Sequence, residues 1–141
     1  MNWNVLGAGA LALGAATSSL AGASTPATIA AGYESEARRA SPAFAGLSAA
    51  RGAELFRTVH GDWSCASCHT ADPRNPGRHA RTGKPIAPLA PAANAERFTS
   101  VATVEKWFRR NCNDVIGREC TAQEKGDVVA YLMRLEAGGA R

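Results

Sequence analysis

Hydrophobic side chains recur at helical spacing in four stretches of the chain. In the first, Thr25 and Pro26 are typical of a helix start, and three apolar residues then fall on one face, namely Ile29, Tyr33 and Ala37. In the second, over 47–59, small and apolar residues share a face: Gly52, Leu55, Phe56 and Val59. Both stretches predict amphipathic helices.

The third stretch, 100–112, carries an apolar stripe that continues toward Val115 and includes one carboxamide: Val101, Val104, Trp107, Phe108, Asn111 and Cys112. The fourth, 121–136, opens with a capping-box pattern from Thr121 to Glu124 and then has Val128, Tyr131, Leu132 and Leu135 on one face. Between 72 and 95, prolines and glycines interrupt the periodicity, and no alternating run predicts a strand. The pattern therefore predicts a small all-α domain with one long irregular loop of functional importance.

Length and charge narrow the class of protein. At 141 residues the chain fits one domain. Its net charge of +4 is spread over clusters at 38–39, 74–84 and 109–110, without the dense basic stripe and interleaved aromatics of a nucleic-acid-binding protein. We interpret these clusters as a solvated face, or as a docking patch for an acidic partner.

The N-terminal segment has the pattern of an export signal. Residues 5–23 are apolar and rich in alanine and glycine, the first charged side chain is Glu34, and Ala21-Gly22-Ala23 suits signal-peptidase cleavage. The alternative is a retained anchor, which the weak hydrophobicity of this segment disfavours. We predict a signal peptide over 1–23 and a mature domain over 24–141, exported to the periplasm, where cysteines meet an oxidising environment.

Residues 65–69, CASCH, form a C-x-x-C-H run, the pattern that attaches c-type haem. Two thiols three positions apart on a helical turn can reach the two vinyl groups at one haem edge, and the adjacent imidazole then lies under the iron. A redox-active dithiol would require a βαβ context and a zinc site two further ligands nearby, and the sequence suggests neither. We predict one haem c, attached at Cys65 and Cys68, with His69 as the proximal ligand.

The second axial ligand is not the usual methionine. Met1 lies in the predicted signal peptide, and Met133 falls off the apolar stripe of the last helix. His79 in the long loop and His60 before the attachment motif are candidate ligands, although each also suits a solvent-facing position. The sixth coordination position of the haem iron is therefore filled by a histidine or an unusual donor, or it is empty.

Asn111 is the other candidate, because its carboxamide lies on an otherwise apolar stripe. A carboxamide in such a place is costly unless it has a partner. That partner is a backbone carbonyl, a buried water or the iron, and the residues alone leave these alternatives open.

Five runs together resemble the Sphaeroides haem protein family over about residues 25–136: ARGAELF, CASCHT, RTGKPIAPLAP, RFTSVATVEKWFRRNCNDVIGREC and EKGDVVAYL. The resemblance implies a class I cytochrome c fold. In that fold the helix before the attachment motif, here the one that contains Gly52, crosses closely over the last helix, and the glycine permits this approach. The resemblance implies a ferric haem bound by His69 and Asn111, and a disulfide between Cys112 and Cys120 beside the haem pocket. It also implies binding of oxygen and nitric oxide after reduction, and electron exchange with a dihaem cytochrome c and a membrane cytochrome b.

The chemistry of this ligand pair predicts a redox-dependent change. An amide oxygen is a hard, weak donor that suits ferric iron better than ferrous iron. We therefore expect reduction to release Asn111 and to open a distal site under Trp107 and Phe108, where a diatomic gas can bind. The implied disulfide would contribute about 2–3 kcal/mol and hold the segment that carries Asn111 near the last helix.

Two other functions stay open from the sequence. One is a plain electron carrier with bis-histidine ligation through His79, and the other is a haem enzyme such as an oxygen or nitric-oxide reductase. We expect a monomer or a weak dimer. Three basic residues are candidates for binding the haem propionates: Arg81, Lys84 and Arg97.

Overall fold

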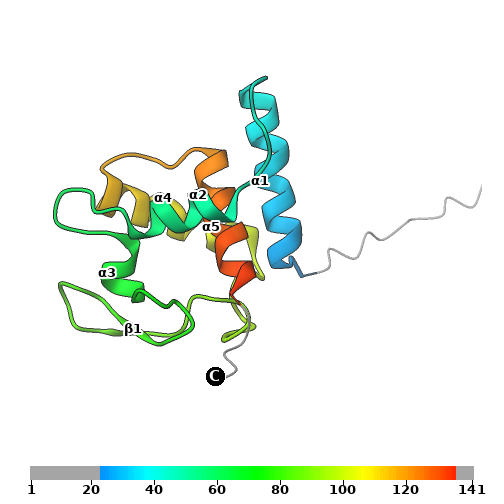
Figure 1. Ribbon diagram of the computed structural model, residues 1–141. Helices are drawn as coiled ribbons and strands as arrows, with labels where there is room; N and C mark the ends of the chain where they lie inside the picture. The colour runs from blue at the N-terminus through cyan, green and yellow to red at the C-terminus, as the bar shows by residue number, and fades with distance from the viewer. Residues whose placement is uncertain (1–22, 136–141) are drawn as a thin grey trace, which may run out of the picture.

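The computed structural model describes residues 23–135, which form five helices and a short hairpin (Figure 1). The helices are α1 (Pro26–Ala40), α2 (Ala49–Arg57), α3 (Cys65–His69), α4 (Val101–Ile116) and α5 (Ala122–Arg134). The strands β1 (Gly77–Arg78) and β2 (Pro85–Ile86) pair antiparallel. The all-α class is confirmed, and within 23–135 no helix is long and apolar enough to cross a membrane. The predicted signal peptide lies outside the described residues, apart from Ala23.

Hydroxyl side chains begin all four long helices. Each accepts a hydrogen bond from a backbone N–H of the first turn, and these residues are Thr25, Ser48, Ser100 and Thr121. The capping box predicted from Thr121 to Glu124 is present, and Thr25 and Thr28 form another. The helix starts predicted at Thr25 and Thr121 are therefore confirmed.

The close crossing of α2 and α5 forms the centre of the molecule (Figure 1). A Cβ atom added at Gly52 would lie 1.9 Å from the backbone oxygen of Asp127, so only glycine allows this approach. Beside the crossing, Phe56 and Leu132 are each only 1% exposed. The role predicted for Gly52, and with it the class I arrangement, agrees with the structure.

Helix α1 packs against the other side of α5. Ile29 and Tyr33 on its apolar face join the same core cluster as Phe56 and Leu132. At Gly126, an added Cβ would lie 2.5 Å from a methyl carbon of Leu47, which shows how tightly the segments around α1 close on α5.

Three residues of the predicted apolar stripes are exposed instead of buried: Val59 (63%), Val101 (53%) and Trp107 (44%). Helix α2 ends at Arg57 because Thr58 turns to an extended conformation, so Val59 lies outside the helical periodicity. Val101 occupies the first turn of α4, beyond the core. The Trp107 ring lies against the Lys106 and Arg110 side chains at 5.9 and 5.7 Å, on the outer side of α4.

The loop over 72–95 is irregular as predicted, except for the hairpin of β1 and β2. These strands have only two residues each, too few for an alternating sequence pattern to reveal.

Candidate haem site

The attachment motif lies on a single rigid turn, α3. Buried Ser64 caps it: its hydroxyl accepts from the Ser67 backbone N–H at 3.2 Å, and the Ser67 hydroxyl accepts from the Ser64 backbone N–H at 2.9 Å. Thr70 takes a positive φ of 64° and ends the turn directly after His69. This cap was not predicted, although the S-x-x-S spacing at Ser64 and Ser67 is a recognisable N-cap signal.

The β1–β2 hairpin covers the attachment turn. A Cβ atom at Gly77 would lie 2.0 Å from the Cys68 backbone oxygen, so the hairpin backbone meets α3 directly. The backbone N–H of Ala80 points at the Cys68 sulfur, 3.3 Å away. The long loop therefore wraps the attachment turn, as its length led us to expect.

The His69 imidazole is suited to bind a metal. Burial lowers its pKa to about 4, with a further lowering from the positive charge of Arg97, so the ring is neutral at physiological pH. Its Nδ1 is buried and has no hydrogen-bond partner among residues 23–135. A neutral imidazole is the form that ligates iron, and the residues here fit a haem with His69 as its ligand.

The thiols of the motif do not resemble those of a redox-active dithiol. Burial raises the pKa of the Cys65 thiol to about 11, whereas catalytic dithiols have a lowered pKa that exposes a reactive thiolate. The only disulfide within the described part of the chain joins Cys112 to Cys120. The surroundings of Cys65 therefore favour haem attachment over thiol exchange.

Asn111 lies half-buried on α4, and its carboxamide makes no hydrogen bond to any residue of the described chain. Its neighbour Asn113 behaves differently: the Asn113 amide donates to the Arg109 carbonyl at 2.7 Å and is exposed. Of the three partners considered for Asn111, the backbone carbonyl is therefore not seen within 23–135. The Asn111 amide is free to bind another group.

The disulfide joins the end of α4 to the segment before α5, with a Cα–Cα distance of 5.7 Å between Cys112 and Cys120. The Arg118 guanidinium, within the loop that the disulfide closes, donates to the Glu124 carboxylate at 2.7 Å. The Thr121 backbone N–H donates to the same carboxylate. The pairing that the resemblance implied is thus present, and the segment after Asn111 is attached to α5.

The two predicted distal aromatic residues differ in their surroundings. Phe108 packs on the core, with its ring edge-on to Tyr33 at 5.8 Å, and Trp107 lies on the outer side of α4. A role for either residue in a distal pocket stays a prediction.

Two of the alternative ligands, His79 and Met133, lie in positions that suit other roles. His79 lies in the hairpin, where its Nδ1 accepts from the Thr82 backbone N–H at 3.2 Å. Met133 is 41% exposed, which agrees with the surface position expected for it.

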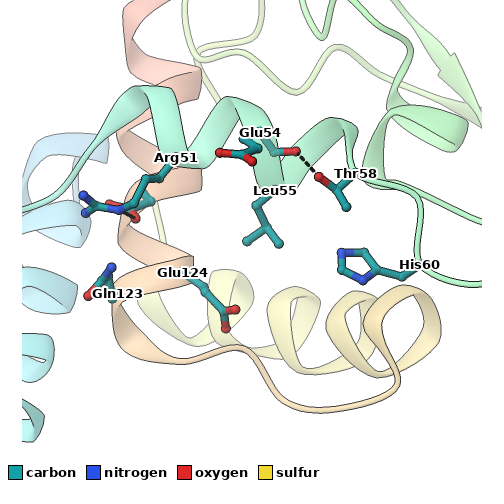
Figure 2. Close-up of a pocket in the computed structure, with 8 residues that line it drawn as sticks. Arg51, Glu54, Leu55, Thr58, His60, Gln123 and Glu124 are labelled. Atoms are coloured by element: carbon teal, nitrogen blue, oxygen red, sulfur yellow. Dashed lines mark hydrogen bonds and ion pairs between the residues drawn. The ribbon is translucent and has the colours of Figure 1, made fainter.

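His60 lines a cavity of about 270 Å³ between α2, the start of α5 and the loop that follows α2 (Figure 2). The His60 Nε2 is buried and has no partner within 23–135. The other lining residues are mostly polar, and neither His69 nor Asn111 is among them. The cavity is therefore separate from the attachment turn, and iron ligation by His60 stays a prediction.

Of the basic residues proposed for the propionates, Arg97 is the one whose charge acts on His69. Its guanidinium donates to the carbonyls of Pro88 and Ala87 at 2.9 and 2.8 Å. Arg81 and Lys84 are exposed on the hairpin.

Comparisons with known proteins match most of the described domain. The protein-family profile described as "Domain of unknown function (DUF1924)" matches residues 42–132. The cytochrome c-type protein SHP of Cereibacter sphaeroides is 48% identical over an alignment of 118 residues, which covers 80% of this chain and 86% of that protein. The structure of oxidised SHP, described as an oxygen-binding cytochrome c, superposes with a TM-score of 0.70 and covers 79% of this chain and 97% of that one.

Cytochrome c'' of Methylophilus methylotrophus is a second relative, 42% identical over 79 residues, or 55% of each chain. Its oxidised crystal structure has a TM-score of 0.71 at 37% identity, covering 77% of this chain and 93% of that one. Its solution structure, which addresses haem-ligand detachment, has a TM-score of 0.72 at 35% identity, covering 82% and 97%. Since the profile and SHP each match most of the chain, this protein belongs to the Sphaeroides haem protein family of c-type cytochromes, with one haem c attached at Cys65 and Cys68.

Proposed function

We propose that His69 and Asn111 bind the haem iron of the oxidised protein, and that Asn111 leaves on reduction so that a diatomic gas, O₂ or NO, binds in its place. The haem supplies one-electron redox chemistry and the iron position at which a gas can bind. The relative SHP is an oxygen-binding cytochrome c, which supports this reading of a chain 48% identical to it.

The single observation that carries the proposal is the unpartnered carboxamide of Asn111. The amide is half-buried, and its polar atoms keep access to solvent instead of being held by the protein, so they can bind a group that enters from that side. The amide oxygen is a hard and weak donor, whereas the His69 imidazole is a stronger one fixed on a one-turn helix between its cap and Thr70. Of the two residues that would hold the iron, Asn111 would therefore be the one to leave on reduction.

The Cys112–Cys120 disulfide then keeps a weak ligand close to its metal. Because it fastens the residue directly after Asn111 to the segment before α5, the amide remains nearby in both redox states. Once released, the Asn111 side-chain N–H₂ can donate a hydrogen bond toward the gas. We propose Trp107 and Phe108, on the turn before it, as the aromatic residues nearest to this position.

Export to the periplasm is supported by the Cys112–Cys120 disulfide, which requires an oxidising compartment to form. Electron exchange with a dihaem cytochrome c and a membrane cytochrome b is supported by the family resemblance and by the exposed basic residues of α4, among them Lys106, Arg109 and Arg110.

Absorption spectra of the purified holoprotein test the axial ligand. We expect Asn111→Ala to convert the ferric spectrum toward high spin and to leave the dithionite-reduced spectrum, with its carbon-monoxide shift, nearly unchanged. Asn113→Ala is the matched control, because that amide bonds only to the Arg109 carbonyl among the described residues. An unchanged ferric spectrum in Asn111→Ala, or a low-spin reduced spectrum in the parent protein, would show that the assignment is wrong.

A further inference from the structure

Helix α4 is attached to the domain mainly through side chains. Helices α1 and α2 pack closely on α5, whereas the α4 backbone makes few such approaches to any other described element. After Asn111, the disulfide at Cys112 attaches α4. Before Asn111, apolar contacts of Val104 and Phe108 and a polar cluster at Glu105 attach it. Because Asn111 lies between these attachments, they determine where its amide can reach.

The polar cluster joins three helices through one carboxylate. One Glu105 oxygen accepts a hydrogen bond of 2.6 Å from the Tyr33 hydroxyl of α1. The other oxygen accepts one of 2.8 Å from the Lys125 ammonium of α5. The Lys125 ammonium also lies 5.5 Å from the centre of the Tyr33 ring, so all three side chains contact one another.

Both partners of Glu105 are well shielded from water. Tyr33 is 5% exposed and the Lys125 side chain 15%, compared with 32% for the Glu105 side chain. Burial alone would raise the pKa of the Glu105 carboxyl, but the hydrogen bonds from Lys125 and Tyr33 outweigh it, and the pKa is lowered. Burial, followed by the hydrogen bond to Glu105, raises the pKa of Tyr33. The cluster thus consists of a carboxylate with two donors, an arrangement stronger than neutral hydrogen bonds.

Tyr33 also contacts α4 a second time. Its ring is edge-on to Phe108, one turn before Asn111, with the ring centres 5.8 Å apart. Helix α1 therefore holds the turn of α4 that leads directly into the ligand residue.

We propose that Glu105 is a positioning residue that, together with Tyr33 and Lys125, holds α4 so that Asn111 stays within reach of the ferric iron. This inference rests on the proposed ligand role of Asn111. Loss of the Glu105 carboxylate leaves the first half of α4 attached only by the apolar contacts of Val104 and Phe108, while the disulfide still holds its end. The helix can then tilt, and Asn111 leaves the iron more readily.

Competition with added imidazole measures how firmly Asn111 is held. Imidazole enters the ferric haem only when the amide leaves, so its apparent affinity rises when α4 is loosened. For Glu105→Gln, which weakens two hydrogen bonds, we expect roughly a threefold to tenfold tighter apparent Kd for imidazole. Tyr33→Phe removes one of the two bonds and is expected to give a smaller shift in the same direction.

Glu34→Gln is the matched control, since it also changes a carboxylate to an amide but in an exposed pair with Arg38 within α1. If the Glu105 residue has only a structural role, Glu105→Gln lowers the unfolding temperature and leaves imidazole affinity within twofold of the Glu34→Gln value, which overturns the proposal. If Glu105→Gln does not fold, the Tyr33→Phe result decides the question by the same criterion. If Asn111→Ala itself changes neither spectrum nor imidazole affinity, the proposed ligation is wrong and this inference falls with it.

Discussion

The hydrogen atom that stands in place of a side chain at Gly52 determines how closely α2 and α5 cross. The methyl group of an alanine would meet three backbone atoms of Asp127 and Val128 within 2.8 Å, and backbone cannot move aside as a flexible side chain can. We therefore expect Gly52→Ala to lower the free energy of unfolding of the holoprotein by about 3 kcal/mol or more, measured by denaturant titration. Gly32→Ala is the control: its methyl meets nothing within 4 Å, so α1 should gain roughly 0.5–1 kcal/mol. Equal stability of the two variants would contradict this account.

Asp127 is a second residue on which the crossing depends. Its carboxylate is 3% exposed and accepts hydrogen bonds from the Arg51 guanidinium at 2.7 and 3.0 Å and from the Ser48 backbone N–H. In Asp127→Asn the new amide N–H₂ is buried against the N–H groups of Arg51 and Ser48, which cannot accept its hydrogen bonds. We expect the free energy of unfolding, measured with denaturant, to fall by about 2–3 kcal/mol. The same change at Asp114, whose pair with Arg110 is exposed, should cost under about 0.5 kcal/mol. A small effect at Asp127 would mean that this buried pair contributes little.

At the scale of helices and loops, the sequence predicts an element well where local chemistry alone decides it. Thr25 and Thr121 mark helix starts because a cap is made by neighbours in sequence. Val59 and Trp107 are different, since their burial depends on where a helix ends and on which face it meets, and both are exposed. Periodicity gives a helix its apolar face but not the partner that covers it.

The disulfide is the covalent link between α4 and the start of α5, and its removal is testable in isolation. It closes a loop across a sequence separation of 8 residues, for which chain entropy predicts about 2–3 kcal/mol. We expect the Cys112→Ser/Cys120→Ser variant to lose that much in a urea titration, and the parent protein to lose the same amount after selective reduction. Because the variant cannot be reduced further, it controls for effects of the reductant on the haem. Identical midpoints for oxidised and reduced parent would contradict a stabilising role.

At the scale of the whole molecule, the sequence predicts the chemistry of the haem site better than it predicts the contacts between helices that hold the site's residues in place. Residues 65–69 and Asn111 carry recognisable chemistry, and a motif or a family resemblance is enough to single them out. The cluster of Tyr33, Glu105 and Lys125 could not be predicted, because its members are separated by 72 and 20 residues and each alone has an ordinary helical position. Such long-range contacts follow only from the packing of three helices.

The pH dependence of stability is also a property of the whole molecule, because several carboxylates bind donors in the folded state. The Arg118 guanidinium, opposed by burial and aided by the Thr121 backbone N–H, lowers the pKa of the Glu124 carboxyl to about 2, and the pKa of Glu105 is lowered as well. A group whose folded pKa is lowered stabilises the protein above its unfolded pKa, here 4.5, and this stabilisation is lost as the pH falls toward 2. We therefore expect the unfolding temperature to fall across this window, as the growing positive charge of the chain adds repulsion.

The variant Glu124→Gln isolates the contribution of one carboxylate to this pH dependence of stability. Because Arg118 is exposed and solvent weakens the pair, we expect the variant to lose only about 1 kcal/mol at pH 7. The difference from the parent should shrink below pH 4.5 and vanish only below pH 2, where the parent carboxyl is itself protonated. Glu34→Gln is the control, because its pair with Arg38 within α1 is exposed and its loss should have little effect on stability. If the free energies of unfolding of Glu124→Gln and of the parent stay the same distance apart down to pH 2, the attachment of the disulfide loop to α5 does not depend on this charge.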